Sequence, residues 1–521
     1  KERNIIMEKK QPELGNYFEL PNPNLRAYFR RSELGNPEDY RTPFWDKRPR
    51  EEILAAWQKI FDQSEISSKY PGLYEFEMDM KSKVGPLSIQ KPLAEQLDGV
   101  EQYFAEYPGE PISEEAIRAT IKYFSSIQGL RLRNRNAVIK KMRTNTNSGT
   151  PYFTKRSNVL SEEKMNKASE YAMAAVKGWR GQEGGIEPDD VKQRVIWMMP
   201  FLLNVTELQF YQPGVEAVQL KKLIPAYISM DYVDFEVTKL FDTKRPEDDV
   251  ICTDFTKFDQ HFNNVMQDCA RKIINSLIDP KDAEWLETVY PVKFNLPLIC
   301  SADIMYSGHH GMGSGSGGTN FDECLSHKAL QFEAAITAGA VLNEHSMAYG
   351  DDGILTYPGI TVEHVTDTYT KHGQEMNLVK QMVSKTDCVV LRRWHSMSYR
   401  KGDIMVGVYS TFRALGRLMG QERFYDPRKW NAKMVTLRAW SILENLKWHP
   451  LFEEFVEFVI KGDKYRLGLE IPGFIENVAS TAQEAIDLLP DFMGYTKTQM
   501  KDMPGIESWR IYKYLSGKEH K

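Results

Sequence analysis

The stretch SMAYGDDGILTY, residues 346–357, constrains the local fold most, because it sets two adjacent aspartates between glycines and between two short apolar runs. Such runs with a glycine-containing connection predict two short strands joined by a tight hairpin. A solvated turn would by itself explain Asp351 and Asp352, since aspartate and glycine are common at bends. A role beyond the turn requires other residues that meet these carboxylates.

The chain is long enough for more than one hydrophobic core. Its 521 residues predict two or more domains or one large elaborated enzyme. The absence of a long apolar run predicts a globular protein without a membrane span. A net charge of −5 counts against a surface that is basic all round, but a local basic groove remains compatible with it.

The five cysteines lie far apart and form no Cys-x-x-Cys pair. This spacing predicts reduced core thiols in a cytosolic setting and no structural zinc site. The opening residues, KERNIIMEKKQPELG, lack the apolar core of a signal peptide, which agrees with that expectation.

A second pair of carboxylates follows a predicted strand in the segment ICTDFTKFDQHF, residues 251–262. Asp254 ends that strand and Asp259 lies five positions later. If the strand pairs beside the aspartate hairpin, Asp254 and Asp351 face each other across a cleft. Converging carboxylates do not all stay ionised unless cations neutralise them. Two Mg²⁺ ions about 3.5–4 Å apart would do so, and oxygen ligands suit such hard cations.

A glycine-rich loop, GMGSGSGG at residues 311–318, precedes a helix predicted to begin at Thr319. Its glycines also fit the G-x-G-x-x-G dinucleotide pattern, but no buried strand or βαβ repeat surrounds them. We favour a flexible loop that grips a nucleotide backbone, with the hydroxyls of Ser314 and Thr319 exposed. The ordinary alternative is a loop that only caps the helix.

A basic run occupies residues 131–156 and contains no acid. With Tyr152 and Phe153 interleaved, it predicts a phosphate-lined channel, whereas the ordinary alternative is a solvated charged face. Arg194 opens a separate apolar segment, RVIWMMP. It could clamp a triphosphate from a rigid base or be an ordinary charge at a strand end. The cations of the run are Arg131, Arg133, Arg135, Lys140, Lys141, Arg143, Lys155 and Arg156.

In this order, DFTKFD, GSGSGGTNF and YGDDG resemble motifs A, B and C of viral RNA-dependent RNA polymerases. The segments YFELPNPNLRAYF and VIWMMPFL are similar to those of picobirnavirus polymerases. The resemblance implies an α+β right hand of fingers, palm and thumb, with an antiparallel palm sheet flanked by helices and a helical thumb. It implies the following division: an N-terminal arm and start of the fingers (1–120), fingers with a basic template and NTP channel (121–250), a palm with a fingers insertion around 270–300 (251–404), and a helical thumb with a C-terminal tail (405–521).

The resemblance also implies catalytic roles. Asp254 and Asp351 would bind two Mg²⁺ or Mn²⁺ ions, with Asp352 supporting the second ion. Lys380 in GQEMNLVKQ is the best match for the lysine that protonates the leaving pyrophosphate, and Lys385 is the second choice.

Further residues match the substrate-binding motifs of the family. NTP binding is implied for Lys192, Arg194, Asp259, Ser314, Thr319 and Asn320, of which Asp259 would sense the ribose 2′ hydroxyl. Contact with template or nascent RNA is implied for Arg143, Ser148, Gly149, Pro151, Lys155, Arg156 and Gly315. A primer-gripping turn is implied for Arg392 and Arg393.

One position departs from the family pattern. Motif B usually has asparagine four positions after the threonine, and this chain has Glu323 there. A carboxylate near Asp259 would repel it or be protonated. The motif match therefore supports ribose recognition by Asp259 less strongly than it supports metal binding by Asp254 and Asp351.

The function implied is replication and transcription of a viral double-stranded RNA genome by two-metal-ion nucleotidyl transfer. The expected partners are template and nascent RNA, NTPs and a viral capsid protein, in the virion interior or host cytoplasm and without a membrane. Two alternatives are a reverse transcriptase or DNA polymerase on the same palm, and a non-catalytic RNA-binding scaffold. Asp259 counts against DNA synthesis. In a site that makes DNA, a bulky residue near this position would be expected instead, because it would exclude the 2′ hydroxyl of an NTP.

Overall fold

The computed structural model describes residues 8–485 and 505–519. Contacts divide the chain into two compact units, each assembled from separated stretches. Unit 1 comprises residues 1–36, 91–180 and 194–390, and unit 2 comprises 37–90, 181–193 and 391–521. The four-part division into arm, fingers, palm and thumb stays a prediction.

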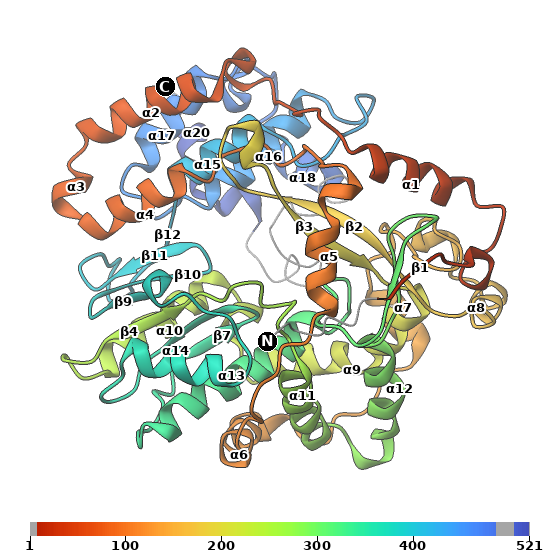
Figure 1. Cartoon of the computed structure of the whole chain (residues 1–521). Coiled ribbons are helices and arrows are strands. Elements are labelled where there is room, and N and C mark those ends of the chain that lie inside the picture. The colour runs from red at the N-terminus through yellow and green to blue at the C-terminus, as the bar shows by residue number, and fades with distance from the viewer. Residues whose placement is uncertain (1–7, 486–504, 520–521) are drawn as a thin grey trace. The chain divides into compact units, whose positions relative to one another are not determined.

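Unit 1 contains most of the helices and nearly all of the strands (Figure 1). Its helices are α1 (Pro23–Leu34), α5 (Leu97–Phe104), α6 (Glu114–Tyr123), α7 (Arg135–Lys141), α8 (Glu162–Ala168), α9 (Phe201–Leu220), α10 (Met230–Thr243), α11 (Asn264–Leu277), α12 (Glu284–Lys293), α13 (Thr319–Thr337) and α14 (Val362–Lys371). Its strands are β1 (Glu8–Lys10), β4 (Val250–Thr253), β5 (Leu298–Ile299), β6 (Met305–Ser307), β7 (Met347–Tyr349), β8 (Asp352–Leu355), β9 (Met382–Ser384) and β10 (Asp387–Val390), with most of β2 (Ala175–Gln182) and β3 (Lys192–Met198).

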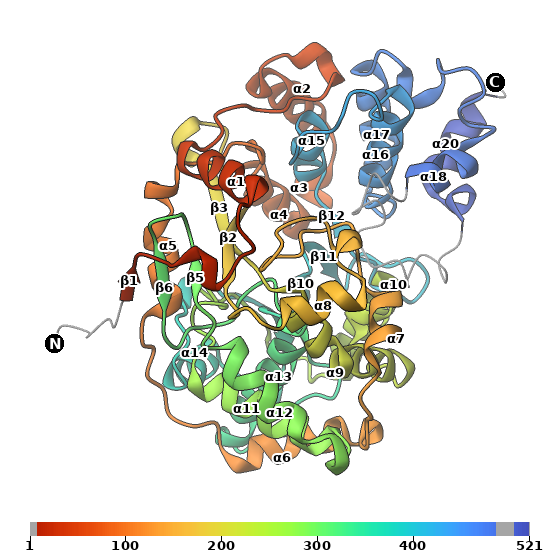
Figure 2. The ribbon, with the colours of Figure 1, turned by 90° about the vertical axis from the view of Figure 1, so that its right-hand side faces the viewer.

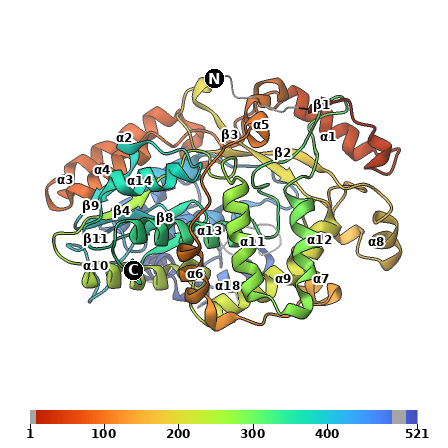
Figure 3. The ribbon, with the colours of Figure 1, turned by 60° about the horizontal axis from the view of Figure 1, so that its bottom comes forward.

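A four-stranded antiparallel sheet of unit 1 has the order β7-β8-β4-β9. The predicted hairpin is present as β7 and β8, and β4 pairs with β8 in the register Thr253↔Gly353. Helices α11 and α13 lie side by side next to it (Figure 3) and share one apolar core with α6. The pairing that the sequence analysis made conditional is therefore confirmed.

The second sheet of unit 1 has the order β1-β6-β5-β2-β3, with β2 and β5 parallel. Helix α1 covers part of it, because its Leu25 and Phe29 pack with Val176, Ile299 and Phe153. The N-cap residue of α1, Asn22, accepts from the Leu25 N–H, which is a typical helix start. This helix is thereby held against the sheet.

Unit 2 is predominantly helical, as expected for the C-terminal residues. Trp57 is fully buried, donates a hydrogen bond to Thr411 Oγ1 (2.9 Å) and contacts Phe455 with ring centroids 4.9 Å apart. Strands β11 (Arg393–Ser396) and β12 (Val408–Tyr409) pair antiparallel. The helices, several of which lie alongside one another in Figure 2, are α2 (Arg50–Gln63), α3 (Ile66–Lys69), α4 (Pro71–Lys81), α15 (Thr411–Met419), α16 (Ala432–Glu444), α17 (Phe452–Lys461), α18 (Val478–Ala485) and α20 (Arg510–Glu519).

The mixture of helices with largely antiparallel sheets confirms the α+β class. All five cysteines are buried and unbridged, as the sequence predicts. Within the described ranges, none of the helices has the length and apolar character needed to span a bilayer.

Candidate active site

Strand β4 delivers Asp254 to the aspartate hairpin. Extending its antiparallel register by one residue sets Asp254 opposite Asp352, with Asp351 next to it at the tip. Asp254 and Asp351 are exposed and Asp352 is half-buried. The backbone of Asp254 is fixed by Gln381, which accepts from its N–H (2.7 Å) and donates to its carbonyl oxygen (2.9 Å). The strand register thus places Asp254 beside Asp351 and Asp352, which lie far from it in the sequence, at one end of the sheet.

Helix α13 holds the hairpin from behind. His327 Nδ1 donates to the Gly350 carbonyl oxygen (2.8 Å), and Gln331 Nε2 donates to that of Met347 (2.8 Å). A Cβ at Gly353 would lie 2.5 Å from the His327 ring, so only glycine fits there. Because the contacts come from a long helix, the hairpin tip is presented from a firm base.

Asn320 lies beside the hairpin. Its Oδ1 accepts from the Tyr227 hydroxyl (2.7 Å), and its Nδ2 would lie 3.2 Å from a Cβ at Gly350. NTP binding by Asn320 stays a prediction.

Asp259 and Glu323 form a carboxyl pair. Burial raises the pKa of Asp259 to about 6, while a hydrogen bond with Glu323 and the charge of Arg194 oppose that rise. Burial and the neighbouring negative charges of Asp259 and Asp351 raise the pKa of Glu323 well above its usual range. Glu323 is therefore the protonated partner near neutral pH, and Asp259 accepts its hydrogen bond. Protonation is the outcome that the sequence analysis gave as one of two for Glu323.

Arg194 is exposed on β3, and its positive charge lowers the pKa of Asp259. The charge on β3 therefore acts on the pair formed by Asp259 and Glu323. Lys192 is exposed on the same strand but belongs to unit 2.

The glycine-rich loop packs tightly against β3 rather than standing free. A Cβ at Gly315 would lie 1.7 Å from the Trp197 carbonyl oxygen, which only glycine avoids. Ser314 Oγ accepts from the Trp197 N–H (3.3 Å). Thr319 Oγ1 donates to the carbonyl oxygens of Gly313 (2.9 Å) and Ser316 (3.2 Å). The expected exposure of the two hydroxyls is therefore wrong, because both residues are half-buried and their hydroxyls shape the loop.

A buried charged network anchors this loop from below. Glu207 on α9 accepts from the Ser316 hydroxyl and from the Gly317 N–H (3.2 Å). Lys293 lies 3.5 Å from Glu207 and 3.0 Å from Asp322, and all three side chains are at most 1% exposed. One lysine therefore compensates two carboxylates in the interior.

Glu207, Lys293 and Asp322 were not among the residues predicted from the sequence. The signal for this network was their presence at helical positions that point into an otherwise apolar core. Charged residues are almost never fully buried unless paired. Their partners come from three different helices, so the pairing itself was not readable from the chain.

The basic run is only partly available for phosphate. Arg131 pairs with Asp282 (2.8 Å), and Arg133 and Lys141 both pair with Glu216. These three cations have acidic partners that are distant in the sequence, and the prediction of a phosphate-lined channel over 131–156 stays a prediction.

The segment NSGTPYF is a tight loop whose residues mainly hold its shape. Ser148 is buried, and its Oγ accepts from the Thr154 N–H (3.2 Å). Gly149 has φ of +64°, and a Cβ there would lie 2.3 Å from the Met199 carbonyl oxygen. Pro151 is buried too, whereas Lys155 is exposed. The segment thus presents Lys155 from a rigid turn.

The remaining basic residues differ in exposure. Arg143 is exposed, and half-buried Arg156 donates to its carbonyl oxygen (3.1 Å) and to Asn204 Oδ1 (2.6 Å). Lys380 is exposed, whereas Lys385 pairs with Asp249 (2.9 Å), which favours Lys380 of the two.

The predicted primer-gripping turn is present as a bend, since Arg392 has φ of +59°. Within unit 2, Arg392 lies 3.5 Å from Glu183, and buried Arg393 donates to the Gly407 carbonyl oxygen (3.2 Å). Contact of either arginine with a primer stays a prediction.

Comparison with known proteins decides the family. The family model for viral RNA-dependent RNA polymerases matches residues 134–458. The chain belongs to the viral RNA-dependent RNA polymerases. Over 525 aligned residues it is 49% identical to a potential RNA-dependent RNA polymerase of human picobirnavirus (strain Human/Thailand/Hy005102/-), covering 96% of this chain and 98% of that protein.

Solved structures agree. A crystal structure of a human picobirnavirus RNA-dependent RNA polymerase has a TM-score of 0.90, and one of its insertion-loop deletion mutant has 0.89. Both are 46% identical to this chain and cover 97% of it and 98% of themselves. The chain is therefore an RNA-directed RNA polymerase, a nucleotidyltransferase with a polymerase fold, and RNA template and NTPs are its substrates.

The carboxylates at the hairpin fit a divalent cation that keeps part of its own hydration. Among the described residues, no group of three or more histidine, cysteine, aspartate or glutamate side chains could hold a metal ion by itself. Mg²⁺ is usually bound through one or two carboxylates together with waters and substrate phosphates. Exposed Asp254 and Asp351 offer such a donor set.

Proposed function

We propose that this polymerase copies and transcribes a double-stranded RNA genome by two-metal-ion nucleotidyl transfer. The observation that carries the proposal is the pairing of β4 with β8, which sets Asp254 beside Asp351 and Asp352. Similarity to human picobirnavirus polymerases along nearly the whole chain supports the genome type.

The chain's own residues have distinct tasks in this reaction. Asp254 and Asp351 would hold two divalent cations, which lower the pKa of the attacking 3′ hydroxyl and neutralise the triphosphate. Arg194, exposed on β3 near Asp259, would orient the triphosphate through its planar guanidinium. Lys380 would give a proton to the leaving pyrophosphate.

Incorporation of labelled NTPs on a single-stranded RNA template with Mg²⁺ tests the metal site. We expect Asp351→Asn and Asp254→Asn each to reduce incorporation by more than about 100-fold, because even groups that only support a metal ligand cost about 10–100-fold. Asp249→Asn is the matched control, since Asp249 pairs with Lys385 instead. Normal synthesis by Asp351→Asn, with RNA binding retained, would overturn the assignment.

We propose that Asp259 recognises the ribose 2′ hydroxyl and that protonated Glu323 keeps Asp259 ionised as an acceptor. The hydrogen bond between the two carboxyl groups supports this division of roles. Asp259→Ala should weaken discrimination between NTPs and dNTPs. Glu323→Gln, a neutral donor of similar shape, should preserve it. An unchanged NTP to dNTP preference in Asp259→Ala would contradict the role.

We further propose that the enzyme works with a viral capsid protein, in the virion interior or host cytoplasm. The likeness to picobirnavirus polymerases supports this placement. Co-sedimentation of the polymerase with assembled capsids tests it, and free polymerase at all capsid concentrations would count against it.

A further inference from the structure

Gln381 holds the backbone of Asp254 with both ends of its amide. Its Oε1 accepts from the Asp254 N–H (2.7 Å), and its Nε2 donates to the Asp254 carbonyl oxygen (2.9 Å). Gln381 is only 8% exposed, so these bonds lie in the interior. One side chain therefore satisfies both polar groups that the main chain of this carboxylate residue offers.

The end of the ladder between β4 and β9 explains why a side chain is needed there. The last pair of the ladder is Cys252↔Met382, and β9 begins at Met382. Two residues further on, the same register would set Asp254 opposite Lys380, but Lys380 belongs to a helical turn instead. The Gln381 amide, with one acceptor and one donor, does for Asp254 what a peptide group of a longer strand would do.

The same amide also bonds the turn that carries Lys380. Gln381 Nε2 donates to the carbonyl oxygen of Asn377 (3.0 Å), and the Asn377 side chain caps the helical turn Leu378–Lys380. The Lys380 N–H donates to the same carbonyl oxygen (3.1 Å), and the Lys380 side chain is exposed. The two hydrogens of one Nε2 group thus join the main chain of Asp254 to the turn of Lys380.

Other bonds hold the same two stretches of unit 1 together without reaching Asp254. The Thr256 N–H donates to the Glu375 carbonyl oxygen (2.9 Å). Gln374 Nε2 donates to the His261 carbonyl oxygen (2.9 Å). Because these bonds remain when Gln381 is replaced, we expect a local displacement of Asp254 and the Lys380 turn rather than unfolding.

We propose that Gln381 is a positioning residue of the polymerase, which fixes Asp254 for metal binding and fixes the Lys380 turn relative to it. Gln381 acts through these two residues and is not itself a catalytic residue. Removing a group that orients a metal ligand typically costs about 10–100-fold in metal affinity or activity. The proposal rests on the proposed function, in which Asp254 binds a divalent cation and Lys380 gives a proton.

Binding of Mn²⁺, followed by electron paramagnetic resonance without NTP or template, tests the contact with Asp254 apart from catalysis. Gln381→Met has a similar length and no amide, and it should raise the dissociation constant of Mn²⁺ about 10–100-fold. Gln374→Met is the matched control, because Gln374 is also buried in the same stretch but bonds His261. Wild-type affinity in Gln381→Met, or an equal loss in both variants, would overturn the proposal.

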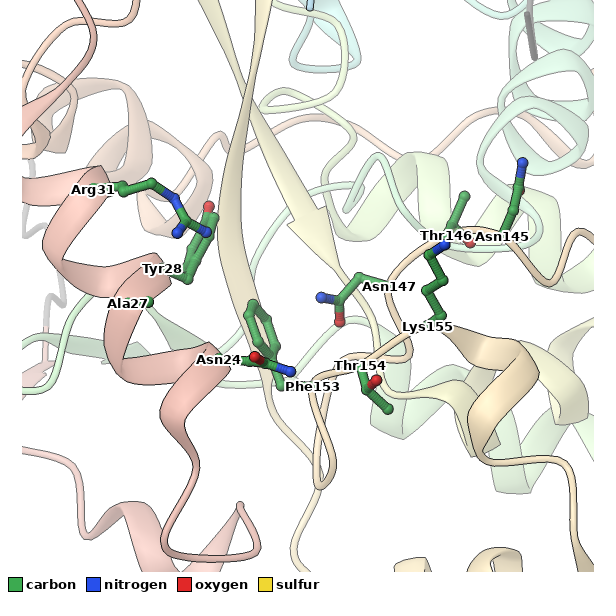
Figure 4. Close-up of a pocket in the computed structure, with 10 residues that line it drawn as sticks. All are labelled: Asn24, Ala27, Tyr28, Arg31, Asn145, Thr146, Asn147, Phe153, Thr154 and Lys155. Atoms are coloured by element: carbon green, nitrogen blue, oxygen red, sulfur yellow. The ribbon is translucent and has the colours of Figure 1, made fainter. Parts of the chain in front are cut away.

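An amide beside the other sheet gives a remote control. Exposed Asn24 lines a pocket of about 340 Å³ between α1 and the loop of residues 145–155, beside the five-stranded sheet (Figure 4). Asn24→Met should bind Mn²⁺ with wild-type affinity. A loss as large as that of Gln381→Met would show a general effect of losing an amide and would also overturn the proposal.

Incorporation kinetics at saturating Mg²⁺ test the link to Lys380. Gln381→Met should lower kcat by about 10-fold or more with little change in the KM for NTP, because the groups that bind the triphosphate are untouched. Combined with Lys380→Met, it should lower kcat by less than the product of the two single effects, since Gln381 acts partly through Lys380. A fully multiplicative loss would overturn this link.

Asp254→Asn, measured in the same assays, separates the role of Gln381 from the proposed function. If Asp254→Asn abolishes incorporation while Gln381→Met binds Mn²⁺ like the wild type, only the role of Gln381 is wrong. If Asp254→Asn synthesises RNA normally, the metal assignment fails and the role of Gln381 falls with it.

Discussion

Lys328 is a buried lysine through which the free energy of unfolding should depend on pH. It is 4% exposed on α13, and its Nζ donates to the Ser346 carbonyl oxygen (2.7 Å), just before the aspartate hairpin. The Nζ also lies 4.6 Å from the centre of the Tyr123 ring. Burial lowers the pKa of Lys328 to about 7.

This depressed pKa sets the sign of a stability change. Between about pH 7 and the ordinary lysine pKa of 10.5, the unfolded chain binds one proton more than the folded chain. The free energy of unfolding should therefore rise with pH by up to about 1.4 kcal/mol per pH unit from this group. Lys328→Met should lack that increment. Urea unfolding of both proteins from pH 7 to 10 checks it, and parallel pH profiles would contradict it.

At the residue scale, the sequence was sufficient to place Asp254 at a strand end and Asp351 and Asp352 at a hairpin, because short-range patterns set both features. Their binding of metal ions stays a prediction. The sequence was insufficient to predict which of Asp259 and Glu323 is protonated, because burial of the two groups sets their pKa values. The sequence was also insufficient to predict the ion pairs of the basic run, since Glu216 and Asp282 are brought to those cations by long-range packing.

At the scale of elements, α13 organises the site. It begins at Thr319, as the sequence predicts, and carries Asn320, Glu323 and His327 on successive turns toward the carboxylates and the hairpin. The start could be predicted because a glycine-rich loop gives way to a periodic apolar pattern. The elements that pack against α13 could not be predicted, because a helix that is buried on most sides has no distinct polar face to orient it.

The network beneath the glycine loop gives an element-scale prediction. Lys293→Met would leave Glu207 and Asp322 as uncompensated buried carboxylates, so we expect a loss of about 3–5 kcal/mol in the free energy of unfolding. Adding Asp322→Asn should restore part of the loss, since the Tyr211 hydroxyl can still donate to the amide oxygen.

A double-mutant cycle by urea unfolding measures this coupling. Additive effects of Lys293→Met and Asp322→Asn would show that the two groups do not stabilise each other. NTP incorporation by the same variants would show whether the loop must be held for synthesis.

At the scale of the whole molecule, net charge conceals how the protein meets RNA. The chain carries −5 overall, yet cations such as Arg31 and Lys155 lie where no carboxylate pairs with them in the described structure. Each RNA phosphate that unpaired cations contact should release condensed counterions. Binding should therefore be salt-sensitive despite the acidic balance.

We expect the logarithm of the RNA association constant to fall linearly with the logarithm of salt concentration, by about 0.7 per phosphate contact. A titration of single-stranded RNA at several salt concentrations measures the slope. A slope near zero would mean that base stacking and hydrogen bonds alone support binding.

Each of the two units is assembled from separated stretches of the chain, a whole-molecule feature that was not predicted from the sequence. The contiguous segments predicted from the sequence followed changes in composition along the chain, whereas residues 37–90 and 181–193 pack with the C-terminal part. Long-range packing of this kind leaves no local pattern.

The buried cysteines make the enzyme convenient for spectroscopy. Because all five thiols are buried, a maleimide dye should leave the folded protein largely unlabelled under native conditions. A single cysteine introduced at an exposed position such as Arg30 would then carry the only dye. Energy transfer between this dye and a labelled RNA would then report RNA binding by individual molecules.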